Sequence, residues 1–203
     1  MRRGVSPSPM HRRATSSIRI DESLVLRPAS KIHIPDIIEA FEETWPDVIR
    51  AMPWINPDKE INSQIEEFIK DTEKKGRSGL LHHWVMIRPW DGYLLGLVGF
   101  DRVTRSDTAS WNLGYWVRSS EQRHGYARKS IDASLEWIGQ TGKIIVEMKV
   151  DPKNLPGTKT VLRTVKKWGG ERSLSGDTAI TVAGIRTVHE CHLIVAESSS
   201  MRL

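Results

Sequence analysis

WNLGYWVRSSEQRHGYARKSIDASLEWI, residues 111–138, is the most informative stretch of the 203-residue chain. Its first part, residues 111–117, is aromatic and apolar, which predicts a strand. A short polar loop, residues 122–127, follows. Small and apolar residues then recur at helical spacing and predict a helix with one apolar face: Ala127, Ile131, Ser134, Leu135 and Ile138. The stretch therefore predicts a strand, a tight loop and a helix in immediate succession.

The loop between the predicted strand and helix has the features of an anion-binding site. The first N–H groups of a helix have no partner within the helix, and the helix dipole adds partial positive charge there. Gly125 lets a ligand approach the backbone closely, and Arg123, Arg128 and Lys129 add full positive charges. These features predict a site for a pyrophosphate group.

Two motifs in the chain resemble a known family. Gln122, Gly125 and Ala127 match the (Q/R)-x-x-G-x-(G/A) loop of the GNAT superfamily of acyl-CoA-dependent N-acetyltransferases. The lead-in LGYWV, residues 113–117, resembles the branch that includes the ribosomal-protein-alanine N-acetyltransferases. The second motif, VDPKN at residues 150–154, resembles the family's valine-aspartate-proline-x-asparagine stretch. The resemblance extends over about residues 24–196.

The order of the predicted elements agrees with this resemblance. Strands are predicted at residues 24–28, 82–88, 93–103, 110–117, 144–150, 178–185 and 188–196. Helices are predicted at residues 34–45, 57–76 and 127–138, and a last helix carries Val161, Leu162, Val165 and Trp168 on one face and stops at Gly169-Gly170. The resemblance implies an α+β (mixed α/β) fold with a central mixed, mostly antiparallel sheet and helices on both faces. It also implies a V-shaped splay between the fourth and fifth predicted strands, residues 110–117 and 144–150.

Charge is unevenly distributed along the chain. Residues 1–20 contain five arginines and no acid, which accounts for the whole net charge of +5. We expect a disordered basic tail over residues 1–20 and a single acyl-CoA N-acyltransferase domain over residues 21–203. The tail also fits a transit peptide or an upstream start codon. The balanced body argues against a general nucleic-acid-binding face, so only the tail suits contact with RNA or the ribosome.

The cysteine count and the hydropathy pattern limit the class of protein further. The single Cys191 excludes an intramolecular disulfide and a cysteine-based zinc site, and it fits a reducing compartment. His189 and His192 do not have the spacing of metal ligands. No apolar run approaches the length of a membrane span. We therefore expect a cytoplasmic protein without a metal or a membrane partner, and the resemblance adds a possible homodimer.

The resemblance implies acetyl-CoA as co-substrate and suggests which residues hold it. Trp116, Val117 and Arg118 would line its pantetheine arm, although residues 115–117 also suit an ordinary buried strand. Asn154 would contact the cofactor, although an asparagine there also suits the cap of the next helix. The loop residues implied for the pyrophosphate are Gln122, Arg123, His124, Gly125, Tyr126 and Ala127.

The catalytic residues of the family do not carry over directly. Asn112 stands where many relatives have a glutamate that accepts the proton of the amine, and an amide cannot act as a base. Gly157 stands where many have a serine or tyrosine that protonates the leaving thiolate. Either the amine arrives neutral and proximity supplies about 7–11 kcal/mol, or another group such as Asp101 or Glu147 serves. The candidate catalytic positions are thus Asn112 and Glu147.

Two adjacent histidines and several tryptophans are candidates for the acceptor side. His82 and His83 face opposite sides of a predicted strand, so one of them can face the cleft. Trp54 and Trp84 would shape an acceptor pocket between the two N-terminal helices and the sheet, although each also suits core packing.

The resemblance implies transfer of an acetyl group from acetyl-CoA to a primary amine, on a protein N-terminus or a small molecule. The attack would be direct, with backbone N–H groups near Trp116 and Val117 stabilising the oxyanion. One alternative is a non-catalytic acyl-CoA-binding sensor or scaffold on the same fold. Another is a nucleotide-binding protein of a different class, although the chain lacks the G-x-x-x-x-G-K-(S/T) pattern of P-loop NTPases.

Overall fold

The structure, a computed structural model, describes residues 13–104, 109–182 and 184–197. Within them one eight-stranded sheet runs in the order β1-β2-β3-β4-β5-β6-β8-β7, and only the β5–β6 pair is parallel. The strands are β1 (Ile18–Asp21), β2 (Leu24–Pro28), β3 (His82–Ile87), β4 (Leu94–Arg102), β5 (Trp111–Val117), β6 (Ile144–Val150), β7 (Glu171–Val182) and β8 (Ile185–Ala196). The expectation of a mixed, mostly antiparallel sheet is confirmed.

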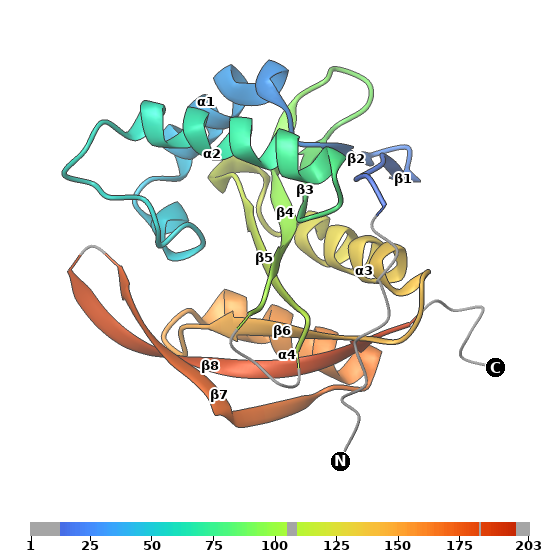
Figure 1. Cartoon of the computed structure of the whole chain (residues 1–203). Coiled ribbons are helices and arrows are strands. Elements are labelled where there is room, and N and C mark those ends of the chain that lie inside the picture. Colours follow the sequence, from blue (N-terminus) through green and yellow to red (C-terminus); the bar gives the residue numbers. More distant parts are fainter. Residues whose placement is uncertain (1–12, 105–108, 183, 198–203) are drawn as a thin grey trace, which may run out of the picture.

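Helices cover both faces of this sheet (Figure 1). The α-helices are α1 (Ile34–Thr44), α2 (Ile61–Arg77), α3 (Tyr126–Gly139) and α4 (Leu155–Trp168), and short 3₁₀ turns are η1 (Lys31–His33), η2 (Asp47–Arg50) and η3 (Ser119–Glu121). Helices α1 and α2 pack on one face, and α3 and α4 pack on the other. The helices therefore lie on both faces, as the resemblance implied.

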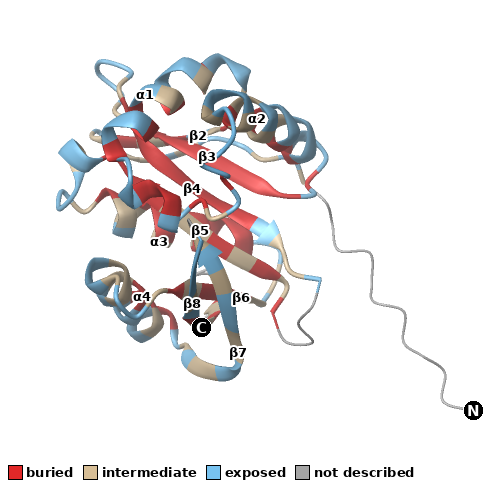
Figure 2. Cartoon of the chain, turned by 90° about the vertical axis from the view of Figure 1, so that its left-hand side faces the viewer, coloured by how far each residue is buried: buried red, intermediate tan, exposed pale blue. Residues whose placement is uncertain are grey.

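Each face of the sheet has its own hydrophobic core, and the central strands between them are buried (Figure 2). The core under α3 and α4 includes Leu26, Trp84, Phe100, Leu113, Leu135 and Val161. The core under α1 and α2 includes Ile37, Phe41, Ile65, Ile69, Val85 and Trp116. Since successive strand residues point to opposite faces, the central strands β2, β3, β4 and β5 contribute to both cores.

Helix α2 begins four residues later than the sequence predicted. Asn56, directly before the predicted start at residue 57, is of a type that caps helices, but its side chain accepts from the Asp58 N–H at 2.9 Å. The Glu60 carboxylate accepts from the N–H groups of Asn62, at 3.0 Å, and Ser63. Because a carboxylate satisfies two free donors and complements the helix dipole, the helix starts immediately after Glu60.

The ordered chain starts earlier than the predicted boundary at residue 20. Strand β1 pairs with β2, with Ile18 opposite Leu26, and both Ile18 and Ile20 pack against the core under α3 and α4. The disorder predicted for residues 13–20 is therefore wrong, because two isoleucines among arginines and serines complete the sheet edge. Residues 1–12, and residues 105–108 between the predicted strands at 93–103 and 110–117, lie outside the described residues.

The C-terminal hairpin is longer than predicted. Strand β7 begins at Glu171 rather than residue 178, and β8 begins at Ile185 rather than residue 188. A shift in register between Ser173 and Thr178 interrupts the alternation that predicts a strand. In α4, the apolar side chain of Leu162 is exposed, whereas those of Val161 and Trp168 are buried.

Candidate functional site

A gap opens in the sheet between β5 and β6. The two strands pair only at Trp111 with Val146 and Asn112 with Glu147. Beyond this point β5 continues to pair with β4 as far as Val117, while β6 continues to pair with β8. The predicted splay between residues 110–117 and 144–150 is therefore confirmed.

Backbone groups of β5 face this gap. The Arg118 N–H donates to Leu95 O of β4 at 2.9 Å. Because the backbone groups of successive strand residues point to opposite sides, those of Trp116 also face β4, whereas those of Tyr115 and Val117 face the gap. The N–H groups of Trp116 and Val117 were expected to stabilise an oxyanion. The N–H of Trp116 points into the sheet toward β4, so only that of Val117 faces the gap.

The loop at the start of α3 is open to a ligand. Gly125 is the helix N-cap, has a φ of 84° and supplies no side-chain cap, and Arg123 has a φ of 68°. A Cβ built on Gly125 would meet nothing within 4 Å. The first N–H groups of α3 are thus presented to solvent, beside the exposed Arg123 and Arg128. Gln122 fixes the loop, since its Nε2 donates to Val117 O at 3.2 Å.

Lys129 does not add a free charge to this loop. Its Nζ lies 2.6 Å from Asp21 Oδ2, at the turn between β1 and β2. The hydrogen bond from Lys129, followed by those from Ser23, lowers the pKa of Asp21 to about 2. The positive charge at the loop therefore comes from Arg123 and Arg128.

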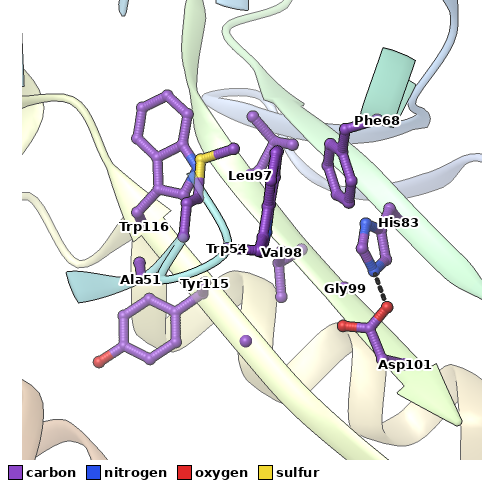
Figure 3. A pocket seen from close by; sticks show the side chains of 12 residues that line it. Ala51, Trp54, Phe68, His83, Leu97, Val98, Gly99, Asp101, Tyr115 and Trp116 are labelled. Atoms are coloured by element: carbon purple, nitrogen blue, oxygen red, sulfur yellow. Dashed lines mark hydrogen bonds and ion pairs between the residues drawn. The ribbon is translucent and has the colours of Figure 1, made fainter. Parts of the chain in front are cut away.

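A small pocket lies on the face of the sheet that α1 and α2 cover (Figure 3). It has a volume of about 60 Å³. Its walls are largely aromatic and contain one polar pair; the lining residues include Met52, Trp54, Phe68, His83, Leu97, Asp101, Gly114 and Trp116. The rings of Trp54 and Phe68 lie 4.5 Å apart, and those of Phe68 and His83 lie 5.3 Å apart. Trp116 Nε1 is buried and has no hydrogen-bond partner among the described residues.

His83 and Asp101 form the polar pair of this pocket. His83 Nε2 lies 3.0 Å from Asp101 Oδ1, and the two side chains are 8% and 53% exposed. Burial raises the pKa of Asp101, but the electrostatic interaction with His83, the hydrogen bond to His83 and the charge of Lys75 together outweigh that effect, and the net pKa is lowered. The ring of His83 lies over Gly99, where a Cβ would come within 2.1 Å of its Cδ2.

The family was established by comparison with known proteins. The model of the GNAT acetyltransferase domain matches residues 23–164. The chain belongs to the GNAT acetyltransferase family. It is accordingly an acyl-CoA-dependent N-acetyltransferase that uses acetyl-CoA as co-substrate. No curated protein matches the chain at a significant level.

Solved GNAT structures share this fold at low sequence identity. The chain is similar to the ribosomal-protein-S5-alanine acetyltransferase from Vibrio fischeri, with 13% identity, a TM-score of 0.69, and coverage of 89% of this chain and 96% of that one. It is similar to RimL, the ribosomal L7/L12 alpha-N-protein acetyltransferase in complex with coenzyme A, with 14% identity, a TM-score of 0.68, and coverage of 91% and 99%. It is also similar to the microcin C7 self-immunity acetyltransferase MccE in complex with acetyl-CoA and AMP, with 17% identity, a TM-score of 0.72, and coverage of 89% and 96%.

Arg118 has a structural position in this GNAT domain. Its guanidinium is buried and donates to Glu39, Glu43 and Leu94 O at 2.8–3.1 Å. It also lies 4.2 Å from the ring centroid of Tyr93. These contacts fasten the end of β5 to α1, so we do not assign the Arg118 side chain to acetyl-CoA.

Asn154 and Gly157 act together at the start of α4. Asn154 Oδ1 accepts from the Gly157 N–H at 3.0 Å and caps the helix. A Cβ at position 157 would lie 2.7 Å from Asn154 Nδ2. A side chain at position 157 would therefore clash with the capping side chain of Asn154, which explains the glycine there. Contact of Asn154 with acetyl-CoA stays a prediction.

The candidate residues Asn112, Glu147 and Trp84 lie in three different settings. Asn112 sits in register between Asp101 on β4 and Glu147 on β6. Glu147 is buried, with Oε1 2.9 Å from Lys149 Nζ, and it does not line the pocket. Trp84 is fully buried in the core under α3 and α4, away from the pocket that Trp54 lines, so the structure contradicts its expected place there.

Of the two candidate histidines, His83 lines the pocket, and so do Met52, Phe68 and Leu97, which the sequence did not indicate. The alternation of strand residues separated His82 from His83 without showing which one faces the cleft.

Among the described residues, no group of three or more His, Cys, Asp or Glu side chains could hold a metal ion. None of the described helices is long and apolar enough to cross a membrane.

Proposed function

We propose that this acetyltransferase moves the acetyl group of acetyl-CoA to a primary amine, carried by a protein N-terminus or a small molecule, by direct attack on the thioester. The observation that carries the proposal is the position of β5. One of its edges borders the gap in the sheet, and residues 114–116 line the pocket. The strand then leads through η3 to the loop at Gly125. A thioester held along β5 would therefore lie beside the pocket.

The size of the pocket supports an amine on a small group. A buried water occupies roughly 10–15 Å³ when volume is measured in this way, so about 60 Å³ has room for only a few such groups. A peptide beginning with alanine or serine, or an amine of similar size, fits this limit. The names of two structural relatives, a ribosomal-protein-S5-alanine acetyltransferase and an alpha-N-protein acetyltransferase, agree with such an acceptor.

Direct attack is favoured over an acyl-enzyme intermediate because the cysteine is unsuited to act as a nucleophile. Cys191 is fully buried on β8, and burial followed by the charge of Glu147 raises its pKa to about 11. Its thiol is therefore neutral at ordinary pH. The chain's contribution is to orient the amine and to present the Tyr115 and Val117 N–H groups toward the gap, where they suit a developing oxyanion.

A second candidate function is a non-catalytic acyl-CoA sensor on the same fold. Asn112 and Gly157 favour it, because neither can supply the acid or base that many relatives have at these positions. Turnover separates the two functions: the sensor binds acetyl-CoA without consuming it, whereas the enzyme acetylates short peptides that begin with alanine or serine, or small primary amines.

The first test is calorimetric titration of acetyl-CoA into the wild type and a Gly125→Glu variant. We expect micromolar binding by the wild type, weakened at least about tenfold by the variant, because a carboxylate at the open loop repels the phosphates and obstructs the N–H groups. Failure of the wild type to bind would contradict the proposed function.

Gly92→Glu is the matched control for strain and charge. Gly92 lies in the turn between β3 and β4 with a φ of 75°, and a Cβ there also meets nothing within 4 Å. It therefore introduces the same side chain into the same kind of backbone, and we expect acetyl-CoA affinity within about twofold of the wild type. Equal losses in both variants would show that backbone strain, not the loop site, weakens binding.

A further inference from the structure

We propose that His83 accepts the proton that the acceptor amine must lose, and that Asp101 is the positioning residue that holds the imidazole for this task. The inference rests on the proposed function. It assigns a base that the family motif lacks, since Asn112 occupies the position where many relatives carry a glutamate.

The geometry of the pair suits a base at the pocket wall (Figure 3). His83 Nε2 lies 3.0 Å from Asp101 Oδ1, so a carboxylate there favours the tautomer with its proton on Nε2. The lone pair is then on Nδ1. The edge of the ring that carries Cγ, Cδ2 and Nε2 lies against Gly99, so the opposite edge, with Nδ1 and Cε1, is turned away from β4. A carboxylate that orients a histidine in this way also stabilises the imidazolium that forms.

The register of the sheet explains how the carboxylate is replaced. Asp101 is directly opposite Asn112 in the β4–β5 pair. Side chains directly opposite each other on neighbouring strands have Cβ atoms about 4.5–5.5 Å apart. Asp101 therefore supplies, from the neighbouring strand β4, the carboxylate that many relatives carry at the position of Asn112. Glu147, the neighbour on the other side, is already paired with Lys149 and does not line the pocket.

The step conserves atoms and charge. The amine enters as an ammonium ion, and His83 Nδ1 takes one proton. The freed nitrogen lone pair forms the C–N bond with the thioester carbon, and the C–S bond breaks with its electron pair remaining on sulfur. A second nitrogen proton reaches the sulfur, which leaves as the thiol. The imidazolium then returns its proton to solvent, and no oxidant or further reactant is needed.

Two further charged or titratable groups, Lys75 and His82, act on the pair. Lys75 on α2 acts on Asp101 electrostatically and opposes positive charge nearby. His82, the adjacent residue on β3, also interacts electrostatically with His83. Its burial lowers its pKa to about 4, so it stays neutral over most of the working pH range.

The test compares His83→Gln with His33→Gln, using as acceptors short peptides that begin with alanine or serine. His33 is also buried, with Nδ1 3.1 Å from Ser30 Oγ, but it does not line the pocket. We expect His83→Gln to lower kcat at neutral pH by about 10²–10⁴-fold, while the Kd for acetyl-CoA stays within about twofold. This loss of kcat should become smaller at higher pH, where the acceptor amine is already deprotonated and needs no base. His33→Gln should retain wild-type kcat.

Two further measurements separate proton transfer from a structural role. Imidazole added to the buffer should partly restore kcat in His83→Ala, and it should have no effect on the wild type. Asp101→Asn should lower kcat without changing the KM for the peptide, because the carboxylate no longer orients the imidazole. A His83→Gln variant with kcat within about threefold of the wild type and the same pH profile would overturn the assignment alone. No turnover by the wild type on any acceptor would overturn the proposed function together with it.

Discussion

At the scale of single residues, Gly99 is the position on which the His83 ring depends. A Cβ at Gly99 would lie 2.1 Å from His83 Cδ2, whereas a Cβ at the opposite residue, Gly114, would meet nothing within 4 Å. We expect Gly99→Ala to lower the free energy of unfolding by about 1–3 kcal/mol through overpacking. Gly114→Ala should change it by less than about 1 kcal/mol.

Urea unfolding, with midpoints and slopes compared, measures both variants. Equal losses of unfolding free energy in Gly99→Ala and Gly114→Ala would show that the loss comes from placing alanine in the strand and not from a clash with the His83 ring. Crystal structures of the two variants would also show whether the His83–Asp101 distance of 3.0 Å survives.

At the scale of elements, one ion pair fastens the β1–β2 turn to α3. Asp21 accepts from Lys129 and from Ser23, and these bonds lower its pKa to about 2. A depressed carboxylate pKa stabilises the folded state above the ordinary value of 3.8, and this contribution is lost as pH falls from about 4 to about 2. Asp21→Asn should therefore lower Tm near neutral pH, and the difference from the wild type should shrink across that range.

The size of this effect is limited by solvent, because the Lys129 and Asp21 side chains are 34% and 38% exposed. We expect at most about 1 kcal/mol. Asp47→Asn is the control, since Asp47 is 73% exposed and lies 3.9 Å from Arg50. A Tm difference between Asp21→Asn and the wild type that stays constant from pH 5 to about 2 would show that ionisation of Asp21 does not stabilise the fold.

At the scale of the whole molecule, residues 13–16 connect elements on both faces of the sheet. The Thr15 N–H donates to Gly76 O of α2 at 2.9 Å, and Thr15 Oγ1 forms a hydrogen bond with His82 Nδ1 of β3 at 2.9 Å. Ser16 accepts from two buried tryptophans, Trp84 Nε1 at 2.8 Å and Trp137 Nε1 at 3.0 Å. Arg13 stacks 3.4 Å above the Trp137 ring. This short segment ties α2, β3 and α3 together.

A pair of truncations tests this connection. Deletion of residues 1–16 should lower the free energy of unfolding by about 2–4 kcal/mol relative to deletion of residues 1–12, because two indole N–H groups lose their acceptors. Comparison of the two truncated chains isolates residues 13–16 in a denaturant melt. Equal stability would show that water replaces these contacts without cost.

Local patterns were sufficient to predict most elements and the position of the loop at Gly125. Strand β5, the loop at Gly125 and helix α3 follow one another within residues 111–139, so hydrophobic periodicity and one glycine specify them. Strand β6 was predicted at its observed bounds for the same reason. Strand β1 was missed because two isoleucines within an arginine-rich segment give too short a signal.

The acceptor pocket, by contrast, depends on contacts between distant parts of the chain. Residues 111–138 by themselves specify a strand, a loop and a helix, since each carries its own local signal, and the loop's resemblance to the GNAT motif implies acyl-CoA. The choice between His82 and His83, the burial of Arg118 and the place of Trp84 depend on the register of the folded sheet. Strand pairing brings His83 to Asp101, 18 residues away. Periodicity shows that adjacent side chains face opposite ways, but only packing against α2 and β4 settles which one meets the cleft.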